Sequence, residues 1–210
     1  LLKQLVKFKL PMIVSTGMAS EKEIRETYVK LKKWNQKDLS FLHCVSVYPP
    51  KPESVNLNNI ISFKKKYNLP IGFSDHSSGT CTSVSSVVLG SNIVEKHITL
   101  DKNYPGPDHP FAIEPDQMKK MVSEIREIEK SLGSFKRTLS KQEEKNKKMI
   151  RRSIVASKLI QKDSIISLNN IKFARPGTGI PSNDFYKLDG KLAKKNIPAE
   201  TIITKNMFKK

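Results

Sequence analysis

Residues 93–109, IVEKHITLDKNYPGPDH, begin as a short apolar run and then place three ionisable side chains in a row. Glu95, Lys96 and His97 interrupt a pattern that otherwise predicts a buried strand. Burying a carboxylate, an ammonium and an imidazole is costly unless each of them finds a partner. Because strand side chains alternate between faces, Glu95 and His97 share one face. This placement favours a strand end that carries chemistry over one that only packs.

The elements that position this strand end repeat along the first part of the chain. Helical patterns separate four apolar runs of strand length, at residues 11–16, 39–46, 69–75 and 92–99. Ser20 and Glu23 form a capping box before the first helical stripe, and Pro115 suits the first turn of the last one. The alternation predicts parallel βαβ units with strands covered on both faces. Four such units form either an open sheet or half of an eight-stranded barrel.

The carboxyl ends of the four runs favour the barrel. Each end carries two residues spaced two apart, namely Ser15 and Gly17, Ser46 and Tyr48, Ser74 and His76, and Glu95 and His97. Residues with this spacing share a face, so all four pairs are expected to point into one mouth. Barrel enzymes have their active sites at this rim. We therefore predict an α/β fold in which residues 1–132 form half of a (βα)8 TIM barrel.

The character of the sequence changes after residue 132. Residues 133–149 are polar and charged without strong periodicity, which predicts a linker. From residue 150 onward, short apolar runs alternate with turn signals such as Lys162-Asp163 and Pro176-Gly177. Residues 150–210 are therefore expected to form a small β-rich domain.

Composition sets the broad class. The chain has 210 residues, and 37% of them are hydrophobic, enough for a folded core. No apolar run approaches the ~18 residues of a membrane helix, and the first residues lack the order of a signal peptide. Two cysteines, Cys44 and Cys81, give no disulfide framework, so a reducing cytoplasm is expected. Both cysteines are expected to be small buried side chains.

The formal net charge of +18 raises the alternative of a basic nucleic-acid-binding protein. The basic residues are mostly single lysines interleaved with glutamates along helix faces. The densest stretch, residues 119–152, shows neither aromatic interleaving nor a nucleic-acid motif. A solvated lysine-rich surface is therefore the favoured interpretation, and neither nucleic acid nor a membrane is predicted as a partner.

Five stretches resemble the sialic acid synthase family. They are STGMAS at 15–20, LHCVSVYPPKPESVNL at 42–57, GFSDHSSG at 72–79, EKHITLDKNYPGPDHPFAIEP at 95–115 and RPGTGI at 175–180. The resemblance implies a TIM barrel followed by a small antifreeze-like (SAF) β-clip domain. On that template, residues 1–132 look like strands five to eight, and the first half of the barrel is absent from this chain.

The resemblance also implies an activity. Family members condense phosphoenolpyruvate with an N-acyl hexosamine, such as N-acetylmannosamine, to give a nine-carbon 3-deoxy-2-keto sugar acid and phosphate. A divalent metal ion, Mn²⁺ or Mg²⁺, holds and polarises the aldehyde oxygen of the sugar. The product would serve surface polysaccharide biosynthesis. Neuraminate, legionaminate and pseudaminate are not distinguished by this sequence.

For the reacting centre, the resemblance assigns His76 and His97 as metal ligands. Glu95 would orient the substrate or a metal-bound water and completes the catalytic set. Two histidines are also compatible with a zinc hydrolase, but no third protein ligand occurs at a typical spacing. Lys96 should point to the outer face of a regular strand, where we expect it to snorkel between helices.

For substrate binding, the resemblance assigns Ser15 and Ser74 to the phosphate. Ser46 and Tyr48 match positions that contact the sugar, and Asp108 matches a carboxylate that binds sugar hydroxyls. Some relatives carry Asn at the position of Ser46, so the identity of the hexosamine stays open. Local hydrogen bonding for the serines and a turn role for Asp108 are the structural alternatives.

Arg175 lies in the predicted small domain. In the family, this arginine reaches across a dimer and contacts the N-acyl group in the partner's barrel, which implies a domain-swapped homodimer. The alternative function is a non-catalytic binding module, with the SAF domain tethered to an inactive half barrel. Such a half barrel would leave sheet edges and apolar faces open, so the enzyme is the favoured interpretation.

Overall fold

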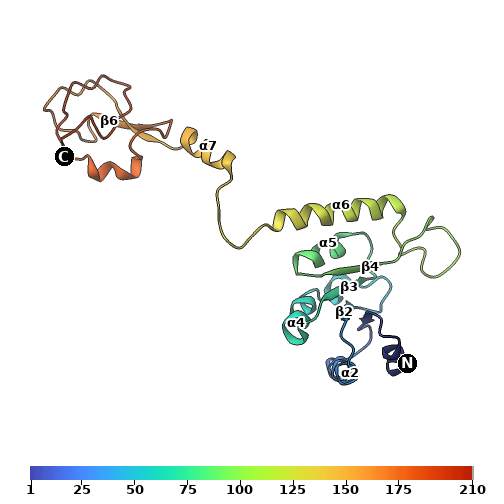
Figure 1. The fold of residues 1–210 in the computed structure, drawn as a ribbon. Helices are drawn as coiled ribbons and strands as arrows, with labels where there is room; N and C mark the ends of the chain where they lie inside the picture. The colour runs from blue at the N-terminus through green and yellow to red at the C-terminus, as the bar shows by residue number, and fades with distance from the viewer. Residues whose placement is uncertain (210) are drawn as a thin grey trace. The chain divides into compact units, whose positions relative to one another are not determined.

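The computed structural model describes residues 1–209, which divide into two compact units, residues 1–134 and 135–209 (Figure 1). The first unit runs from blue to yellow-green in the figure, and the second runs from yellow to red. Each unit has its own hydrophobic core.

The first unit contains one parallel sheet. Its four strands are hydrogen-bonded in chain order: β1 (Met12–Ser15), β2 (Leu39–Cys44), β3 (Ile71–Asp75) and β4 (Ile93–Lys96). All three strand pairs are parallel, as the alternation of strand and helix patterns predicts. The strand ends therefore lie along one edge, and the curled sheet is half of a barrel.

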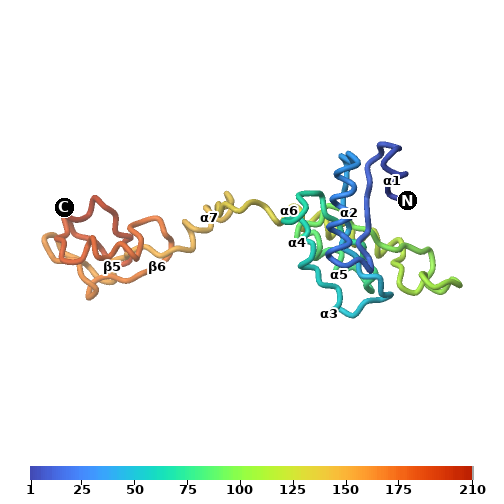
Figure 2. The backbone as a smooth tube through the Cα atoms, turned by 90° about the horizontal axis from the view of Figure 1, so that it is seen from below, coloured from blue at the N-terminus to red at the C-terminus, as the bar shows by residue number. Residues whose placement is uncertain are grey.

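Helices connect the strands of this unit, and Figure 2 labels these helices along the tube. A short helix α1 (Leu2–Leu5) and a 3-10 turn (Val6–Phe8) precede β1. The connecting and following helices are α2 (Glu21–Lys33), α3 (Pro52–Val55), α4 (Asn58–Tyr67), α5 (Cys81–Val88) and α6 (Pro115–Leu132). The predicted capping box of Ser20 and Glu23 opens α2, and Pro115 lies in the first turn of α6.

The helix-facing side of the sheet carries the main core. Leu31 from α2 and Ile60 from α4 pack with Phe41 and Ile71 of the sheet, and all four are fully buried. The other side of β1 is open, since Ile13 is 57% exposed and Ser15 is also exposed. The alternating faces therefore separate a packed outer side from an inner side that leads to the strand ends.

The second unit is built on aliphatic side chains. Strands β5 (Ser153–Ala156) and β6 (Ile171–Ala174) pair antiparallel, and a 3-10 helix covers Ser182–Lys187. The remaining backbone is tied together by isolated bridges. Its core includes the fully buried side chains of Ile154, Ile160, Ile166, Leu188, Ile197 and Ile203.

The second half of the predicted linker over residues 133–149 forms helix α7 (Lys141–Ile150). The helix begins at a capping box of Ser140 and Glu143. A hydrogen bond from Arg137 and contacts with Ser140 lower the pKa of Glu143 to about 2. None of the α7 residues is buried, so the helix shows no apolar period in the sequence.

Among the described residues, no helix has the length and apolar composition needed to cross a membrane.

Candidate active site

The two histidines assigned by resemblance lie side by side at the carboxyl ends of β3 and β4. His76 follows Asp75 directly, and His97 follows Lys96. Their ring centroids are 5.2 Å apart. Tyr48, from the segment after β2, stacks on His76 at 4.1 Å and meets His97 edge-on at 5.9 Å. The parallel register therefore brings together three of the predicted side chains.

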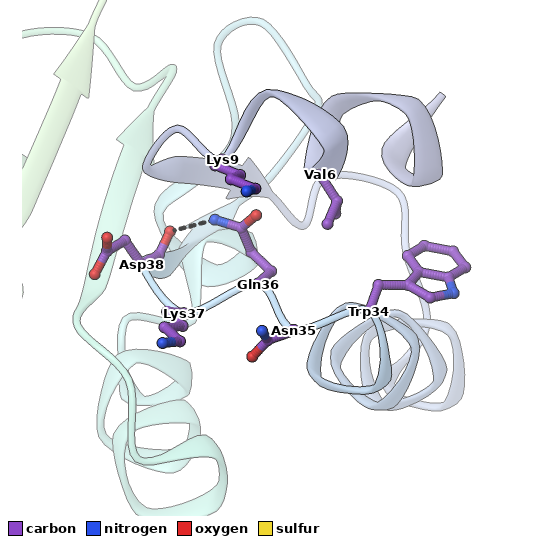
Figure 3. Close-up of a pocket in the computed structure, with 7 residues that line it drawn as sticks. All are labelled: Val6, Lys9, Trp34, Asn35, Gln36, Lys37 and Asp38. Carbon is purple, nitrogen blue, oxygen red and sulfur yellow. Dashed lines mark hydrogen bonds between the residues drawn. The ribbon is translucent and has the colours of Figure 1, made fainter.

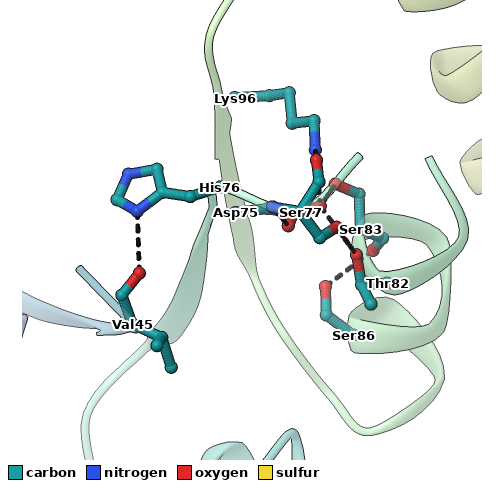
Figure 4. A network of polar contacts seen from close by, with 8 residues as sticks. All are labelled: Val45, Asp75, His76, Ser77, Thr82, Ser83, Ser86 and Lys96. Atoms are coloured by element: carbon teal, nitrogen blue, oxygen red, sulfur yellow. Dashed lines mark hydrogen bonds and ion pairs between the residues drawn. The ribbon is translucent and has the colours of Figure 1, made fainter. Parts of the chain in front are cut away.

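The His76 ring has a defined hydrogen-bonding state. Its Nδ1 lies 2.9 Å from the carbonyl oxygen of Val45, which can only accept, so Nδ1–H donates (Figure 4). The neutral ring then carries its lone pair on Nε2, the arrangement typical of a metal-ligating histidine held by a backbone carbonyl. The donor set of His76 and His97 therefore fits a divalent ion. Among residues 1–209, no cluster of three or more His, Cys, Asp and Glu side chains is placed to hold a metal.

Glu95 and Ser74 face each other on the inner side of the sheet. The two residues are direct partners in the β3–β4 register, and the Ser74 hydroxyl donates to Glu95 Oε1 at 2.6 Å. This bond fixes the carboxylate beside the histidines. It also occupies the hydroxyl proton, so Ser74 can donate to a ligand phosphate only if its hydroxyl turns away from Glu95.

Ser15 and Ser46 lie on the β1 and β2 side of the same mouth. The backbone N–H of Gly17 lies 3.4 Å from Ser15 Oγ, which leaves the Ser15 hydroxyl proton available to a ligand. A Cβ atom at Gly17 would lie 2.3 Å from Ser46 Oγ and 3.1 Å from Cys44 Sγ. Only glycine allows the first two strand ends to approach this closely.

The two cysteines differ from one another. Cys44 is buried, as expected, and its Sγ lies 4.0 Å from both Ser46 Oγ and His76 Nδ1. Cys81 is exposed at the start of α5, so its predicted burial is wrong. The mouth position of Cys44 follows from the period-two pattern of β2, because residues 44 and 46 share a face.

Asp108 belongs to the long segment between β4 and α6, whose two ends are joined. Thr99 N donates to Ile113 O, and Ile113 N donates to His97 O. Burial raises the pKa of Tyr48, and the neighbouring Cys44, Asp108 and Glu95 raise it further. Asp108 is therefore close enough to act electrostatically on Tyr48, and the phenol keeps its proton at neutral pH.

Within this segment, Thr99 and His109 form a contact that the sequence reasoning missed. Thr99 Oγ1 lies 2.7 Å from His109 Nδ1, and Thr99 is buried. Tyr104 meets the His109 ring edge-on at 5.6 Å. The only signal in the sequence is a polar residue after the strand, which does not reveal a partner ten positions away.

Lys96 does not snorkel to the surface, so that prediction is wrong. Its side chain is 2% exposed and forms an ion pair with Asp75 Oδ2 at 3.1 Å, while the Asp75 side chain is fully buried. Lys96 also donates to the backbone oxygen of Ser77 (Figure 4). The outer face was correctly predicted, but a partner on the next strand keeps the ammonium inside.

Asp75 is the centre of a wider network on the outer side of β3. Its Oδ1 accepts from Ser77 N at 2.8 Å, and its Oδ2 accepts from Thr82 Oγ1 at 2.9 Å and Ser83 Oγ at 2.5 Å. Burial by itself raises the pKa of Asp75. Hydrogen bonds from Ser83 and Ser77 and the charge of Lys96 outweigh burial, so the pKa lies below its ordinary value.

Arg175 is exposed at the end of β6 in the second unit, where its Nε donates to Ile150 O at 2.8 Å. The loop after it is firmly held. Ser153 Oγ donates to Pro176 O at 2.6 Å and accepts from Gly179 N at 2.9 Å. A Cβ at Gly179 would lie 2.2 Å from Ile202, which explains the glycine. Arg175 therefore precedes a loop that is held by hydrogen bonds, and the role predicted for Arg175 stays a prediction.

A separate cavity of about 340 Å³ lies at the opposite edge of the sheet (Figure 3). It is lined by Val6, Lys9, Trp34, Asn35, Gln36, Lys37 and Asp38. These residues precede β1 and β2, so the cavity is at the amino ends of the strands. The Gln36 amide donates to the backbone oxygens of Leu10 and Asp38, both at 2.9 Å. Barrel enzymes use the other edge, so this cavity is not part of the candidate active site.

The fold and the rim define the first unit as half of a TIM-barrel protein, joined to a small β domain. Comparison with known protein families gives the particular class. The NeuB family matches residues 1–137, and the SAF domain matches residues 151–209. The chain therefore belongs to the NeuB family and carries a SAF domain, as the resemblance of the five sequence stretches predicts.

Similar proteins include synthases of two different sugar acids from Campylobacter jejuni. The N,N'-diacetyllegionaminic acid synthase is 39% identical over 96% of this chain and 61% of its own length. The pseudaminic acid synthase of strain 81-176 is 40% identical over 92% of this chain and 56% of its own length. The chain thus spans little more than half the length of these curated relatives.

Among solved structures, the N-acetylneuraminic acid synthetase of Leptospira borgpetersenii, in complex with citrate, is similar to this chain. It is 36% identical with a TM-score of 0.64, over 69% of this chain and 50% of that protein. A solved protein of this class therefore shares the fold of a large part of this chain.

Proposed function

We propose that this chain is part of a nonulosonate synthase that condenses phosphoenolpyruvate with an N-acyl hexosamine. The observation that carries the proposal is the convergence of His76, His97 and Glu95 at one rim of a NeuB-family half-barrel. The names of the similar synthases support the reaction class. Because those names cover different sugar acids, the exact hexosamine is left to the experiment below.

In the proposed reaction, C3 of phosphoenolpyruvate forms a bond with the aldehyde carbon of the open-chain sugar. A water oxygen adds at C2, and the bond between C2 and the phosphate oxygen breaks. The products are a 3-deoxy-2-keto sugar acid and inorganic phosphate. Surface polysaccharide biosynthesis is the proposed use of the sugar acid.

His76 and His97 would hold a divalent metal ion, which when bound supplies a positive charge that polarises the aldehyde oxygen. Imidazole nitrogens suit Mn²⁺ better than Mg²⁺, which prefers oxygen ligands. We therefore propose Mn²⁺ as the preferred ion. Val45 fixes the His76 ring through its carbonyl, and the Ser74 hydroxyl holds Glu95 in place to orient the attacking water.

The remaining rim residues are proposed to bind the two substrates. Ser15 offers a hydroxyl proton to the phosphate, and Ser74 does so once it turns from Glu95. The neutral phenol of Tyr48 donates to a sugar oxygen, whereas Asp108 accepts from sugar hydroxyls. Ser46, next to Gly17, limits the size of the group that fits beside β2.

The test measures phosphate release from phosphoenolpyruvate by the full-length protein with Mn²⁺ and a panel of N-acyl hexosamines. Mass spectrometry identifies the sugar acid. We expect phosphate release to require the sugar. His76→Ala and His97→Ala should each lower activity by at least ~100-fold, because losing a metal ligand costs more than losing a group that only hydrogen-bonds a ligand. Lys30→Ala, at an exposed position on α2, serves as the control and should keep full activity.

Two results would contradict the proposal. Phosphate release without any sugar would indicate a phosphatase. Full activity of either histidine variant at low Mn²⁺ would mean that this histidine only packs and that the metal is held elsewhere.

Arg175 is proposed to contact the N-acyl group in the barrel of a partner subunit, in a domain-swapped homodimer. Arg175→Ala should then raise KM for the sugar far more than KM for phosphoenolpyruvate. Mixing this variant with His97→Ala should restore part of the activity, because one barrel of the mixed dimer has both groups. If subunits exchange and no activity returns, Arg175 does not act across subunits.

A further inference from the structure

The buried ion pair between Asp75 and Lys96 lies directly behind the two histidines. Asp75 precedes His76 and Lys96 precedes His97, and the two charged residues are partners in the β3–β4 register. Strand alternation places Ser74 and Glu95 on the inner face and Asp75 and Lys96 on the outer face. Figure 4 shows His76 on one side of β3 and the Asp75 network on the other.

The network holds the backbone on both sides of His76. Ser77 N donates to Asp75 Oδ1 at 2.8 Å, and Ser77 O accepts from Lys96 Nζ. The residue before His76 is thus a member of the ion pair, and the residue after it is bonded to both members. Lys96 in turn fixes the strand end from which His97 follows.

The network also joins this rim to the helix behind it. Asp75 Oδ2 accepts from Thr82 Oγ1 and Ser83 Oγ at the start of α5, in addition to Lys96. The donors to the carboxylate come from the turn after β3, from the start of α5 and from β4. Such a satisfied network defines a single geometry, whereas apolar side chains of the same size would allow the strand ends to shift.

We propose that the Asp75–Lys96 ion pair is a positioning device that sets the separation and orientation of His76 and His97. The proposal rests on the proposed function, in which these histidines hold a divalent ion. Neither Asp75 nor Lys96 touches the ion or the substrates. Their effect passes through the backbone of the two strand ends.

The experiment compares Lys96→Met with the double variant Asp75→Asn/Lys96→Met. The single variant leaves a buried carboxylate without its cation and should fold poorly. In the double variant, both charges are gone, and the hydroxyls of Thr82 and Ser83 can accept from the new amide. The double variant should therefore regain most of the stability, measured by urea unfolding with Trp34 fluorescence.

The decisive readout is Mn²⁺ affinity, measured by electron paramagnetic resonance without any substrate. We expect the double variant to bind Mn²⁺ about 10–100-fold more weakly than the unmodified protein, although its fold is restored. The control is Lys30→Met, which breaks an exposed pair with Glu26 on α2. It should change neither stability nor Mn²⁺ affinity. Unchanged Mn²⁺ affinity in the stable double variant would overturn the proposal and leave the pair a purely structural role.

A second measurement separates this proposal from the metal assignment. The chain has four histidines, His43, His76, His97 and His109, whose ring C–H signals are resolvable by NMR without metal. In the double variant, the His76 and His97 signals should shift, and the His43 and His109 signals should not. If the unmodified protein fails to bind Mn²⁺, the metal site is wrong, and these signals still test the positioning role. Unshifted His76 and His97 signals would overturn it.

Discussion

The two units of the chain treat ionisable side chains in opposite ways. The first unit buries Asp75, Lys96 and His43 within or behind its sheet. In the second unit, the ion pairs are exposed, such as Lys172 with Glu200 and Lys209 with Asp163. Within residues 1–209, the second unit buries a single polar side chain, that of Ser153.

The difference shows which unit holds its strands in one fixed arrangement through buried polar groups, and which unit relies mainly on apolar packing. A buried charge is tolerated only when partners surround it, so it specifies one arrangement of the strands that carry it. The second unit obtains its stability from aliphatic packing of residues such as Ile154 and Leu188. Its one buried hydroxyl, on Ser153, holds the loop that presents Arg175. In both units, buried polar groups occur next to predicted site residues.

The largest expected effect is that of Asp75→Ala, which removes the anion and leaves Lys96 buried without its partner. Loss of one member of a buried pair costs about 3–5 kcal/mol. Trp34 is the only tryptophan of the sequence and lies in the first unit, so its fluorescence during urea unfolding measures this loss. If the free energy of unfolding falls by less than about 1 kcal/mol, this buried pair contributes no more than an exposed ion pair does.

The next effect is that of Ser153→Ala in the second unit. The Gly179 amide and the Pro176 carbonyl each lose a partner in a part-buried setting, so we expect a loss of about 1–3 kcal/mol. Faster hydrogen exchange of the Gly179 amide measures the loosening of the loop. Ser157→Ala, at an exposed position on the same segment, is the matched control and should leave this exchange unchanged.

The third effect is a pH dependence that arises from His43. Its Nε2 donates to Val55 O at 2.6 Å, and burial lowers its pKa below the ordinary 6.5 despite that bond. Below pH 6.5, the unfolded chain binds a proton that the folded chain excludes. The free energy of unfolding should therefore fall with decreasing pH, by at most about 1.4 kcal/mol per pH unit. In the His43→Gln variant, the part of this pH dependence that His43 causes should vanish. An unchanged pH dependence would mean that other groups cause it.

The smallest effect is expected for Lys172→Ala, which breaks the pair with Glu200. Both side chains are largely exposed, at 42% and 69%, and such pairs contribute less than about 1 kcal/mol. Thermal unfolding of the second unit should hardly change, and the change should shrink further in high salt. A loss comparable to that of Asp75→Ala would remove the contrast between the units.

Much of the first unit could be predicted because its signals are local or strictly periodic. The capping box of Ser20 and Glu23 and the first-turn Pro115 are confirmed, and the parallel sheet follows from the alternation of patterns. The closeness of His76 and His97 follows from the parallel register, since equivalent strand ends meet at one edge.

The features that could not be predicted depend on partners far along the chain. Alternation places Lys96 on the outer face, but only the position of Asp75 on β3 decides that the ammonium stays buried. The Val45 carbonyl that orients His76 is a backbone group and has no sequence signal. Helix α7 does have a local signal, the capping box at Ser140, and was missed because the helix lacks an apolar stripe.

Gly17 lies so close to Ser46 that the side chains at these two positions cannot be changed independently. A methyl group at residue 17 would occupy the place of the Ser46 hydroxyl, 2.3 Å away, and a larger side chain at residue 46 needs the same space. Substitutions at the two positions are therefore expected to be non-additive, with the tolerated choice at one set by the size of the other. Any redesign of the sugar preference through residue 46 has to vary residue 17 at the same time.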